Sequence, residues 1–469
     1  MRNKKAIVWF QKDLRLHDNE ALSEAFVNSD EVIPVYVFDS REFLGKTWNF
    51  EFQKTAYGRT HFLIDAVRSL RDNLRKHGSD LVIRFGIVEE ELFSLARMLN
   101  VDAVYCNRER TYEEVKIQEE LEKKLWTIGR EIRYSRGKMM YYTSDLPFPI
   151  THTPENFSSF RKSVERYTRI RNPLPIPAIT SFKREDILHL EDIPTGLTHI
   201  PKDALMPDIF EGGEEAALGF MDKLIESYSN TKDLESAQYS FDKMLPWLSS
   251  GCISAKMVFH KIRTADEQCP MPELKDFVFT KLLWRDFYRL MGKKYGNAIF
   301  KKGGVKNSPL SLKDDEKLLQ LWIEGRTGFP YMDACMRQIA KKYWLAEPSR
   351  FLVSSFLIYV LKVNWQMGAE YFESQLLDYD PCSNYGKWNY VAGISSDTKD
   401  GYECNILYQS QKLDPSGDYI RRWIPELAQI PDSKIHRPDL LTTAELASYG
   451  VKLGQTYPSP MINPVRWAK

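Results

Sequence analysis

The chain has 469 residues, enough for two or three domains with a large buried core. Its hydrophobic and charged fractions, 43% and 28%, are ordinary for a globular protein, and a formal net charge of +1 excludes a globally basic nucleic-acid-binding protein. The most apolar run, residues 351–361, is shorter than the about 20 residues that a membrane-spanning helix needs, so we expect no membrane partner. The six cysteines are scattered without metal-ligand spacing, which predicts reduced thiols in the cytoplasm and no metal site.

The N-terminal part of the chain alternates short apolar runs with amphipathic stretches. Four runs predict buried strands: residues 6–10, 32–38, 81–85 and 103–106. Residues 58–78 predict a helix that ends at Gly78. This alternation predicts an α/β domain with a parallel sheet over residues 1–135. The charged, glycine-free stretch after the first strand, residues 11–19, matches neither of the usual phosphate-cradling motifs.

The C-terminal part of the chain predicts a separate helical domain. Proline-rich sequence between residues 171 and 207 favours an interdomain linker, which we place at residues 136–211. Residues 212–469 then predict an all-helical domain. Three stretches in this domain predict loops: residues 229–245, 301–313 and 376–390.

The segment "KLLWRDFYRL", residues 281–290, predicts a helix with Lys281, Trp284 and Arg285 on one face. One interpretation is an ordinary amphipathic helix with a buried Trp. The other is a cavity wall, where the Trp stacks on a planar group and the Arg binds an anion. Basic residues continue at Arg289, Lys293, Lys294, Lys301 and Lys302. These residues are typical of a phosphate-binding patch and equally of a solvated charged face.

An arginine at the start of an apolar segment needs an acidic partner. Residues 349–365 predict a helix that begins beside Arg350 and extends to Trp365. Asp378 and Asp380, in the expected loop, are the natural partners for the guanidinium. A purely structural ion pair is the alternative to a functional one.

Four long motifs carry a resemblance to a known family. They are "IVWFQKDLRLHDNEAL" (7–22), "WIEGRTGFPYMDACMRQ" (322–338), "YDPCSNYGKWNYVAG" (379–393) and "LDPSGDYIRRWIPEL" (413–427). Together the chain resembles the photolyase/cryptochrome family, most closely its DASH-type cryptochromes. Tyr390, where ordinary photolyases have Trp, favours the DASH branch. The resemblance implies an N-terminal α/β domain and a helical domain that binds FAD.

The resemblance also implies roles for single residues. Asn384 matches the residue that faces flavin N5, and Trp388 matches the electron donor beside the flavin ring, with Trp365 next in the relay. Trp284 and Tyr390 match the pair that flanks an extruded pyrimidine dimer. The residues implied to hold FAD are Arg350, Asp378 and Asp380 at the flavin ring, with Tyr228 and Arg285 at the phosphates. Because the phosphate loop is altered, we expect Lys243 to carry part of the phosphate charge. Glu109 matches the Glu that contacts a 5,10-methenyltetrahydrofolate antenna.

Several positions depart from the family pattern. Where the family has hydroxyl-bearing residues at the FAD phosphates, this chain has Phe241, Asp242 and Leu245. Lys281 replaces a Glu that contacts the lesion. Glu347 and Pro348 replace an Asn and an Arg, and Leu312 stands where the relay usually ends in a surface Trp.

The expected function is blue-light-driven, FAD-dependent repair of cyclobutane pyrimidine dimers by a monomer acting preferentially on single-stranded DNA. The altered lesion-side residues keep a second interpretation open, a blue-light receptor with little repair activity. A third is a flavin-poor protein that binds nucleic acid through the basic residues. No His lies in the Trp284 or Arg350 segment, which disfavours repair of the (6–4) photoproduct.

Overall fold

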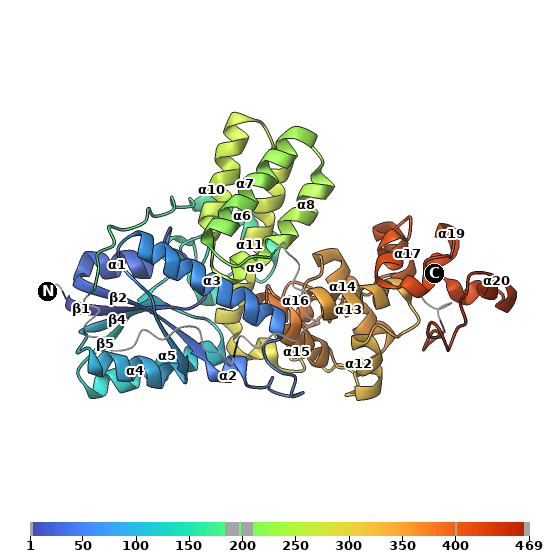
Figure 1. Ribbon diagram of the computed structural model, residues 1–469, viewed down its shortest axis with the longest axis horizontal. Coiled ribbons are helices and arrows are strands. Elements are labelled where there is room, and N and C mark those ends of the chain that lie inside the picture. The colour runs from blue at the N-terminus through green and yellow to red at the C-terminus, as the bar shows by residue number, and fades with distance from the viewer. Residues whose placement is uncertain (1–2, 183–196, 198–209, 399–400, 464–469) are drawn as a thin grey trace. The chain divides into compact units, whose positions relative to one another are not determined.

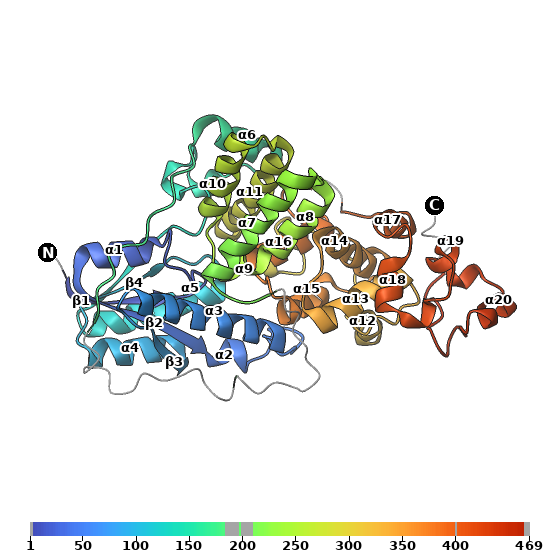
Figure 2. The same ribbon diagram turned by 45° about the horizontal axis from the view of Figure 1, so that its top comes forward.

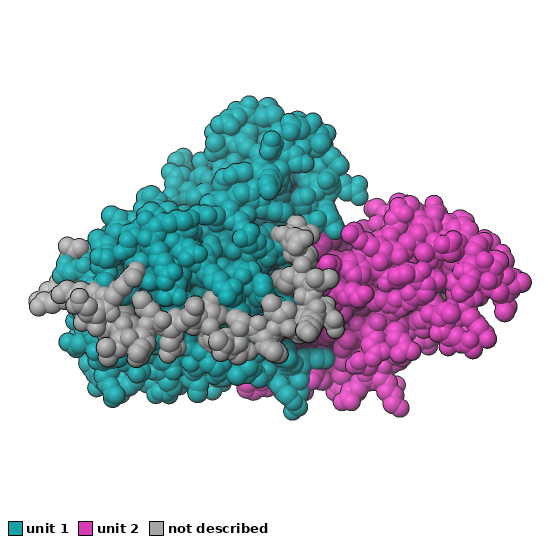
Figure 3. Space-filling model, viewed as in Figure 1, with its two compact units in different colours: residues 1–47, 51–299, 377–386 teal, residues 48–50, 300–376, 387–469 magenta. Residues whose placement is uncertain are grey.

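The computed structural model describes residues 3–182, 197, 210–398 and 401–463. Figure 3 colours the two compact units into which the chain groups. The first comprises Met1–Thr47, Glu51–Ile299 and Leu377–Gly386, and the second comprises Trp48–Phe50, Phe300–Leu376 and Lys387–Lys469. The boundaries expected at residues 135 and 211 stay predictions, and residues 183–196 and 198–209 of the expected linker lie outside the described part.

A five-stranded parallel sheet forms the centre of the first unit. Its strands are β1 (Asn3–Phe10), β2 (Ser29–Asp39), β3 (Val82–Gly86), β4 (Ala103–Asn107) and β5 (Glu131–Ser135). They lie in the order β3-β2-β1-β4-β5, and every pairing is parallel. The predicted α/β fold is therefore confirmed, and four of the strands fall where the apolar runs predict them.

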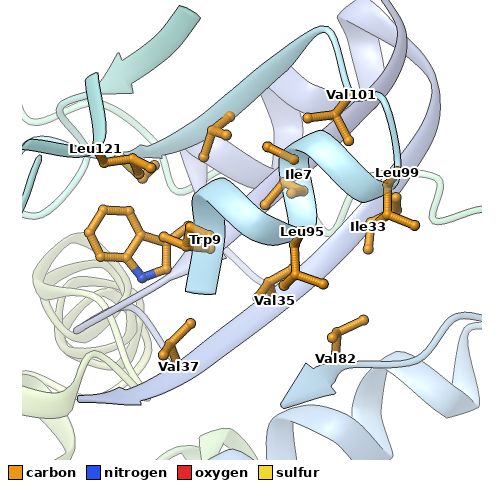
Figure 4. Close-up of a cluster of buried hydrophobic side chains, with 14 of the residues drawn as sticks. Ile7, Trp9, Ile33, Val35, Val37, Val82, Leu95, Leu99, Val101 and Leu121 are labelled. Carbon is orange, nitrogen blue, oxygen red and sulfur yellow. The ribbon is translucent and has the colours of Figure 1, made fainter. Parts of the chain in front are cut away.

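Helices cover both faces of the sheet, as Figure 1 shows. The bounds are α1 (Glu20–Asn28), α2 (Ser40–Phe43), α3 (Tyr57–Lys76), α4 (Val88–Met98) and α5 (Tyr112–Thr127). Alternate strand residues such as Ile7 and Trp9 pack with Leu95 of α4 and Leu121 of α5 in one buried cluster (Figure 4). Because neighbouring strand residues face opposite sides of the sheet, the strand residues between these face α1 and α3.

The helical part of the first unit packs as a group of roughly parallel and antiparallel helices (Figure 2). Its members are α6 (Phe157–Tyr167), α7 (Glu214–Thr231), α8 (Leu234–Lys243), α9 (Leu245–Ser250), α10 (Ala255–Gln268) and α11 (Pro272–Tyr295). The loop expected at residues 229–245 is wrong, because this stretch is mostly helical. Asp233 caps α8 by accepting a hydrogen bond from the Ser236 amide, so only a short turn separates α7 from α8.

The charged stretch at residues 11–19 is a buried connection within the first unit. His17 hydrogen-bonds through Nδ1 to Glu214, at the start of α7. Lys256 Nζ lies 2.8 Å from the Asp18 carboxylate. The stretch therefore joins the sheet to the helices through its charged side chains. Glycine, which has no side chain, could not make these contacts.

The second unit is helical among its described residues. Its longer helices are α12 (Glu316–Ile323), α13 (Pro330–Lys342), α14 (Glu347–Ser355), α15 (Trp365–Gln375) and α17 (Ile406–Leu413). Shorter ones are α18 (Asp418–Trp423), α19 (Asp432–Ile435) and α20 (Thr443–Ser448). In the part that the structure describes, no helix has the length and apolar character needed to cross a membrane.

Two sequence predictions in this region are wrong. Residues 381–391 form a helix, α16 (Pro381–Val391), rather than an irregular loop. Pro381 opens α16 at a position where a missing N–H costs nothing, and Gly386 lies inside it because a side chain there would meet the Tyr288 ring. The helix from Arg350 does not reach Trp365: α14 passes into a π-helical turn, Phe356–Val360, and α15 starts at Trp365.

Candidate functional site

Trp284 on α11 lies in a cluster of aromatic rings within the first unit. Its indole stacks face to face on the Phe157 ring of α6, with centroids 3.8 Å apart and planes 4° apart. Phe287 meets the indole edge-on at 5.6 Å, and the Tyr288 ring is tilted at 5.3 Å. Trp284 remains half-buried, so one ring face is held and part of the side chain is still accessible.

Arg285, the next residue, is held by the backbone. Its Nη1 donates to the Lys138 carbonyl at 2.9 Å and its Nη2 donates to the Leu248 carbonyl at 3.1 Å. Burial, helped by the nearby Arg289 charge, lowers the pKa of Arg285 to about 10. The side chain is therefore still a cation at neutral pH, with a fixed orientation.

Lys281 and Asp242 are two of the departures from the family pattern, and they contact each other. Lys281 Nζ lies 3.4 Å from Asp242 Oδ1, and its charge also lies 5.2 Å from the centre of the Phe277 ring. The neighbouring Phe241 is fully buried and packs edge-on against Phe277. The acid and the base therefore neutralise each other, which counters the repulsion expected between Asp242 and a phosphate.

Tyr228 and Lys243 lie on α7 and α8, which pack together. The Tyr228 hydroxyl donates to Glu273 at 3.4 Å, and the ring is buried. Lys243 Nζ lies 4.4 Å from the centre of the exposed Tyr239 ring. Of the residues assigned to the FAD phosphates, Lys243 thus presents a half-exposed cation and Tyr228 a buried hydroxyl.

A buried ionic network lies beside Arg285 in the first unit. Arg289 Nη1 donates to Asp380 Oδ2 at 2.9 Å, and Nη2 lies 3.5 Å from Glu109, which also pairs with Lys138. Burial opposes ionisation of Asp380, but the Arg289 and Arg285 charges hold its pKa below the ordinary value. Arg289 is 4% exposed, so its placement in a basic surface patch is wrong.

Asp380 also starts α16. Its Oδ1 accepts a hydrogen bond from the Ser383 amide at 2.9 Å, the pattern of a helix N-cap. The Asn384 amide donates to the Asp380 carbonyl at 2.8 Å in the first turn. Asn384 is half-exposed and precedes the buried Trp388 by one turn of the same helix.

Trp388 and Trp365 are both buried in the second unit. The Trp388 indole packs edge-on against Phe372 at 5.3 Å, and Gly368 has no room for a side chain beneath it. The Trp365 indole N–H donates to the Lys302 carbonyl at 2.9 Å. Packing therefore fixes both indoles, as an electron-transfer role requires.

Three further residues of interest lie in the second unit. Glu347 forms an ion pair with Lys387 of α16, so the acid at this altered position is also neutralised. Arg350 is 8% exposed, and its Nε donates to the Leu345 carbonyl at 2.6 Å. Tyr390 is half-buried and meets Phe351 edge-on at 6.1 Å.

Comparison with known proteins decides the family. Residues 6–179 match the DNA photolyase family, and residues 277–468 match the FAD binding domain of DNA photolyase. Cryptochrome DASH of Gloeobacter violaceus is 37% identical over 99% of this chain and 94% of its own length. The chain belongs to the photolyase/cryptochrome family. Cryptochrome DASH of Xenopus laevis is likewise 37% identical, over 99% of this chain and 90% of its own length.

Solved structures of this family agree with the fold. The Synechocystis sp. PCC6803 cryptochrome has a TM-score of 0.93 and 34% identity, covering 100% of this chain and 98% of its own. A bacterial class III photolyase from Agrobacterium tumefaciens has a TM-score of 0.86 and 27% identity, covering 100% and 96%. Both comparisons confirm the α/β and helical parts expected for a photolyase/cryptochrome.

The residues present fit the FAD that the family domain supports as cofactor. Arg285 remains cationic, and the nearby Asp242 charge is compensated by Lys281. Asn384 offers a half-exposed carboxamide. Phe241, Asp242 and Leu245 bear no hydroxyl, so at these three positions the chain offers no Ser or Thr side chain to a phosphate.

Sequence reasoning missed Lys138 and Lys387, and it placed Arg289 in a basic patch rather than in a buried ion pair. Arg289 follows Arg285 by four residues and Leu282 by seven, so the helical period already placed it on a partly buried face. Glu109 is buried in an ion pair rather than solvated, and the antenna it was matched to stays a prediction. Among the described residues, no group of three or more His, Cys, Asp or Glu side chains could hold a metal.

Proposed function

We propose that this protein is a monomeric, cytoplasmic enzyme that uses blue light and FAD to split cyclobutane pyrimidine dimers, preferentially in single-stranded DNA. The observation that carries the proposal is α16, which presents a half-exposed carboxamide at Asn384 and a buried indole at Trp388 one turn later. The match of residues 277–468 to the FAD binding domain of DNA photolyase supports the cofactor.

Bound FAD supplies the one-electron chemistry, and the protein supplies orientation and charge. Asn384 can donate or accept a hydrogen bond at flavin N5 as the protonation of that atom changes. Arg350 and Asp378 bind at the flavin ring edge, where the cation favours a negatively charged ring. Tyr228, Lys243 and Arg285 bind at the phosphates, the last with its guanidinium held by two carbonyls.

The buried Arg289–Asp380 pair orients the start of α16. Because Asp380 caps the helix and stays ionised, Asn384 is held in a fixed first turn. With FAD bound, Trp388 would be the first electron donor to the flavin, and Trp365 would be the next donor. Both indoles are buried and packed, so neither needs to move to react.

The substrate is a pyrimidine dimer turned out of the DNA strand. Trp284 and Tyr390 flank the extruded bases, because flat aromatic faces compensate for lost stacking. Phe157 holds one face of the Trp284 indole and so leaves the other for the lesion. The exposed Lys293, Lys301 and Lys302 contact DNA phosphates. The antenna, 5,10-methenyltetrahydrofolate, contacts Glu109.

Purified protein tests this proposal directly. Its absorbance spectrum should show bound flavin, and after reduction it should restore dimer-containing oligonucleotides under blue light, faster on single than on double strands. A Trp284→Ala variant that still binds flavin should lose substrate affinity. Flavin-loaded protein that repairs neither substrate would reject repair as the function.

A second candidate function is a blue-light receptor that signals through flavin photoreduction. Two lesion-side positions favour it. Lys281 forms an ion pair with Asp242 and Glu347 forms one with Lys387, so each charge is already paired within the protein rather than directed at a lesion. Limited proteolysis in the dark and under blue light separates the two functions. A receptor should change its cleavage pattern with light, whereas a repair enzyme should not.

A further inference from the structure

A series of buried aromatic rings runs from Trp388 through the second unit. Trp388 contacts Phe372 of α15 with ring centroids 5.3 Å apart. Phe372 stacks on Trp322 of α12 at 6.0 Å and an interplanar angle of 20°. Tyr371 then meets Trp322 edge-on at 5.8 Å. The series therefore links the indole expected beside the flavin to a second indole on another helix.

Trp322 has the chemistry of an electron donor, and its surroundings fit one-electron oxidation. It is 0% exposed, and its indole N–H donates to the Val353 carbonyl at 3.3 Å. A carbonyl oxygen stabilises a positive indole but is too weak a base to remove its proton. Phe372 has no oxidisable heteroatom, so the electron passes between the two indoles across its ring without oxidising it.

The route through Trp365 lacks its usual last member in this chain. The position expected to carry the surface Trp is Leu312, a side chain that cannot donate an electron. The Trp388–Phe372–Trp322 series offers a donor that does not depend on that position.

We propose that Trp322 is an electron donor that reduces the oxidised Trp388 across the Phe372 ring. The inference rests on the proposed function, since photoexcited oxidised flavin is the oxidant that takes one electron from Trp388. Trp322 then gives one electron to Trp388. The net change is one electron removed from Trp322 and one delivered to the flavin. No bond between heavy atoms forms or breaks, and the indole proton stays on Trp322, hydrogen-bonded to the Val353 carbonyl.

Photoreduction of the flavin-loaded protein, followed by transient absorption, tests the route. We expect Trp322→Phe to lower the yield of long-lived flavin reduction several-fold and to remove a cationic indole radical signal. Trp365→Phe should leave part of the yield, and the double variant should abolish it. Trp344→Phe, a buried Trp of the same unit, is the matched control and should behave as wild type.

The possible results separate the electron route through Trp322 from the proposed function. Flavin-loaded Trp322→Phe with an unchanged yield and radical signal overturns this inference and leaves the proposed function standing. Purified protein without flavin overturns the proposed function and the inference together. If Trp322→Phe does not fold, Phe372→Leu removes the bridging ring instead, and an unchanged yield there has the same meaning.

Discussion

Arg289 and Asp380 form a buried ion pair, with Nη1 of the guanidinium 2.9 Å from Oδ2 of the carboxylate. They are 4% and 5% exposed, and Asp380 also caps α16. The pair thus ties α11 to the first turn of the helix that carries Asn384. Each buried charge is compensated mainly by the other, with Glu109 also beside Arg289 and the Arg285 charge also near Asp380.

Removing one partner of this pair should be costly. We expect Arg289→Met to lower the free energy of unfolding by about 3 kcal/mol, because it leaves the buried Asp380 without its hydrogen-bonded cation, with only the more distant Arg285 charge beside it. Adding Asp380→Asn should recover part of that loss, since Asn still caps a helix. Urea denaturation measures both. Lys123→Met, which breaks the exposed Lys123–Glu120 pair, is the control and should lower the unfolding free energy far less than Arg289→Met does. Equal losses at the two sites would contradict the argument.

Asp286 should make stability depend on pH in the opposite sense to an ordinary carboxylate. It is 0% exposed, and burial raises its pKa to about 6, although it accepts hydrogen bonds from the Met140 and Tyr141 amides. Between pH about 4 and 6 the folded state holds a proton that the unfolded state has released. Stability from this group is therefore present at low pH and lost as pH rises through 6, by roughly 3 kcal/mol.

Asp286→Asn tests this sign. The variant cannot ionise, so the difference in unfolding free energy between wild type and variant should shift in favour of the variant as pH rises from 4 to 7. Thermal melts across that range, each compared with wild type at the same pH, give the difference. A constant difference across the range would show that Asp286 does not titrate there.

The sequence predicts those parts of the fold that depend on local periodicity. The strands and α3 have clear apolar patterns, and α3 ends at Lys76, just before Gly78 as expected. The α16 helix was misread as a loop, because Pro381 and Gly386 are common in turns. Only the structure shows that Pro381 opens the helix and that Gly386 makes room for a ring of α11.

Ion pairs at the site could not be read from the sequence. Arg289 pairs with Asp380, which is 91 residues away, and Lys281 pairs with Asp242 across two helices. Each side chain alone is compatible with a solvated surface. The contacts depend on how the helices pack, which no local pattern encodes. The resemblance identifies the altered positions one at a time, and the structure shows that two of them, Lys281 and Asp242, compensate each other.

The Lys281–Asp242 pair should help the protein to retain FAD. Lys281→Glu alone places two carboxylates together beside the residues proposed to bind the phosphates, so we expect flavin retention to fall several-fold. Adding Asp242→Ser removes the repulsion and supplies a hydroxyl for a phosphate, so retention should rise to at least the wild-type level. The flavin-to-protein absorbance ratio after dialysis measures retention. If the double variant retains no more flavin than Lys281→Glu alone, the two positions act independently.

Lys301 and Lys302 should contribute to DNA affinity through phosphate contacts alone. Both are exposed at the end of the segment that follows α11. Each phosphate contact with a single strand adds about 0.7 to the slope of log affinity against log salt concentration. Lys301→Gln with Lys302→Gln should therefore weaken binding of undamaged and dimer-containing oligonucleotides alike and reduce that slope by about 1.4, twice the value for one contact. Lys116→Gln, an exposed lysine of α5, is the control and should leave the slope unchanged. Fluorescence anisotropy titrations at several salt concentrations measure it, and a loss of affinity confined to the damaged strand would instead place these lysines at the lesion.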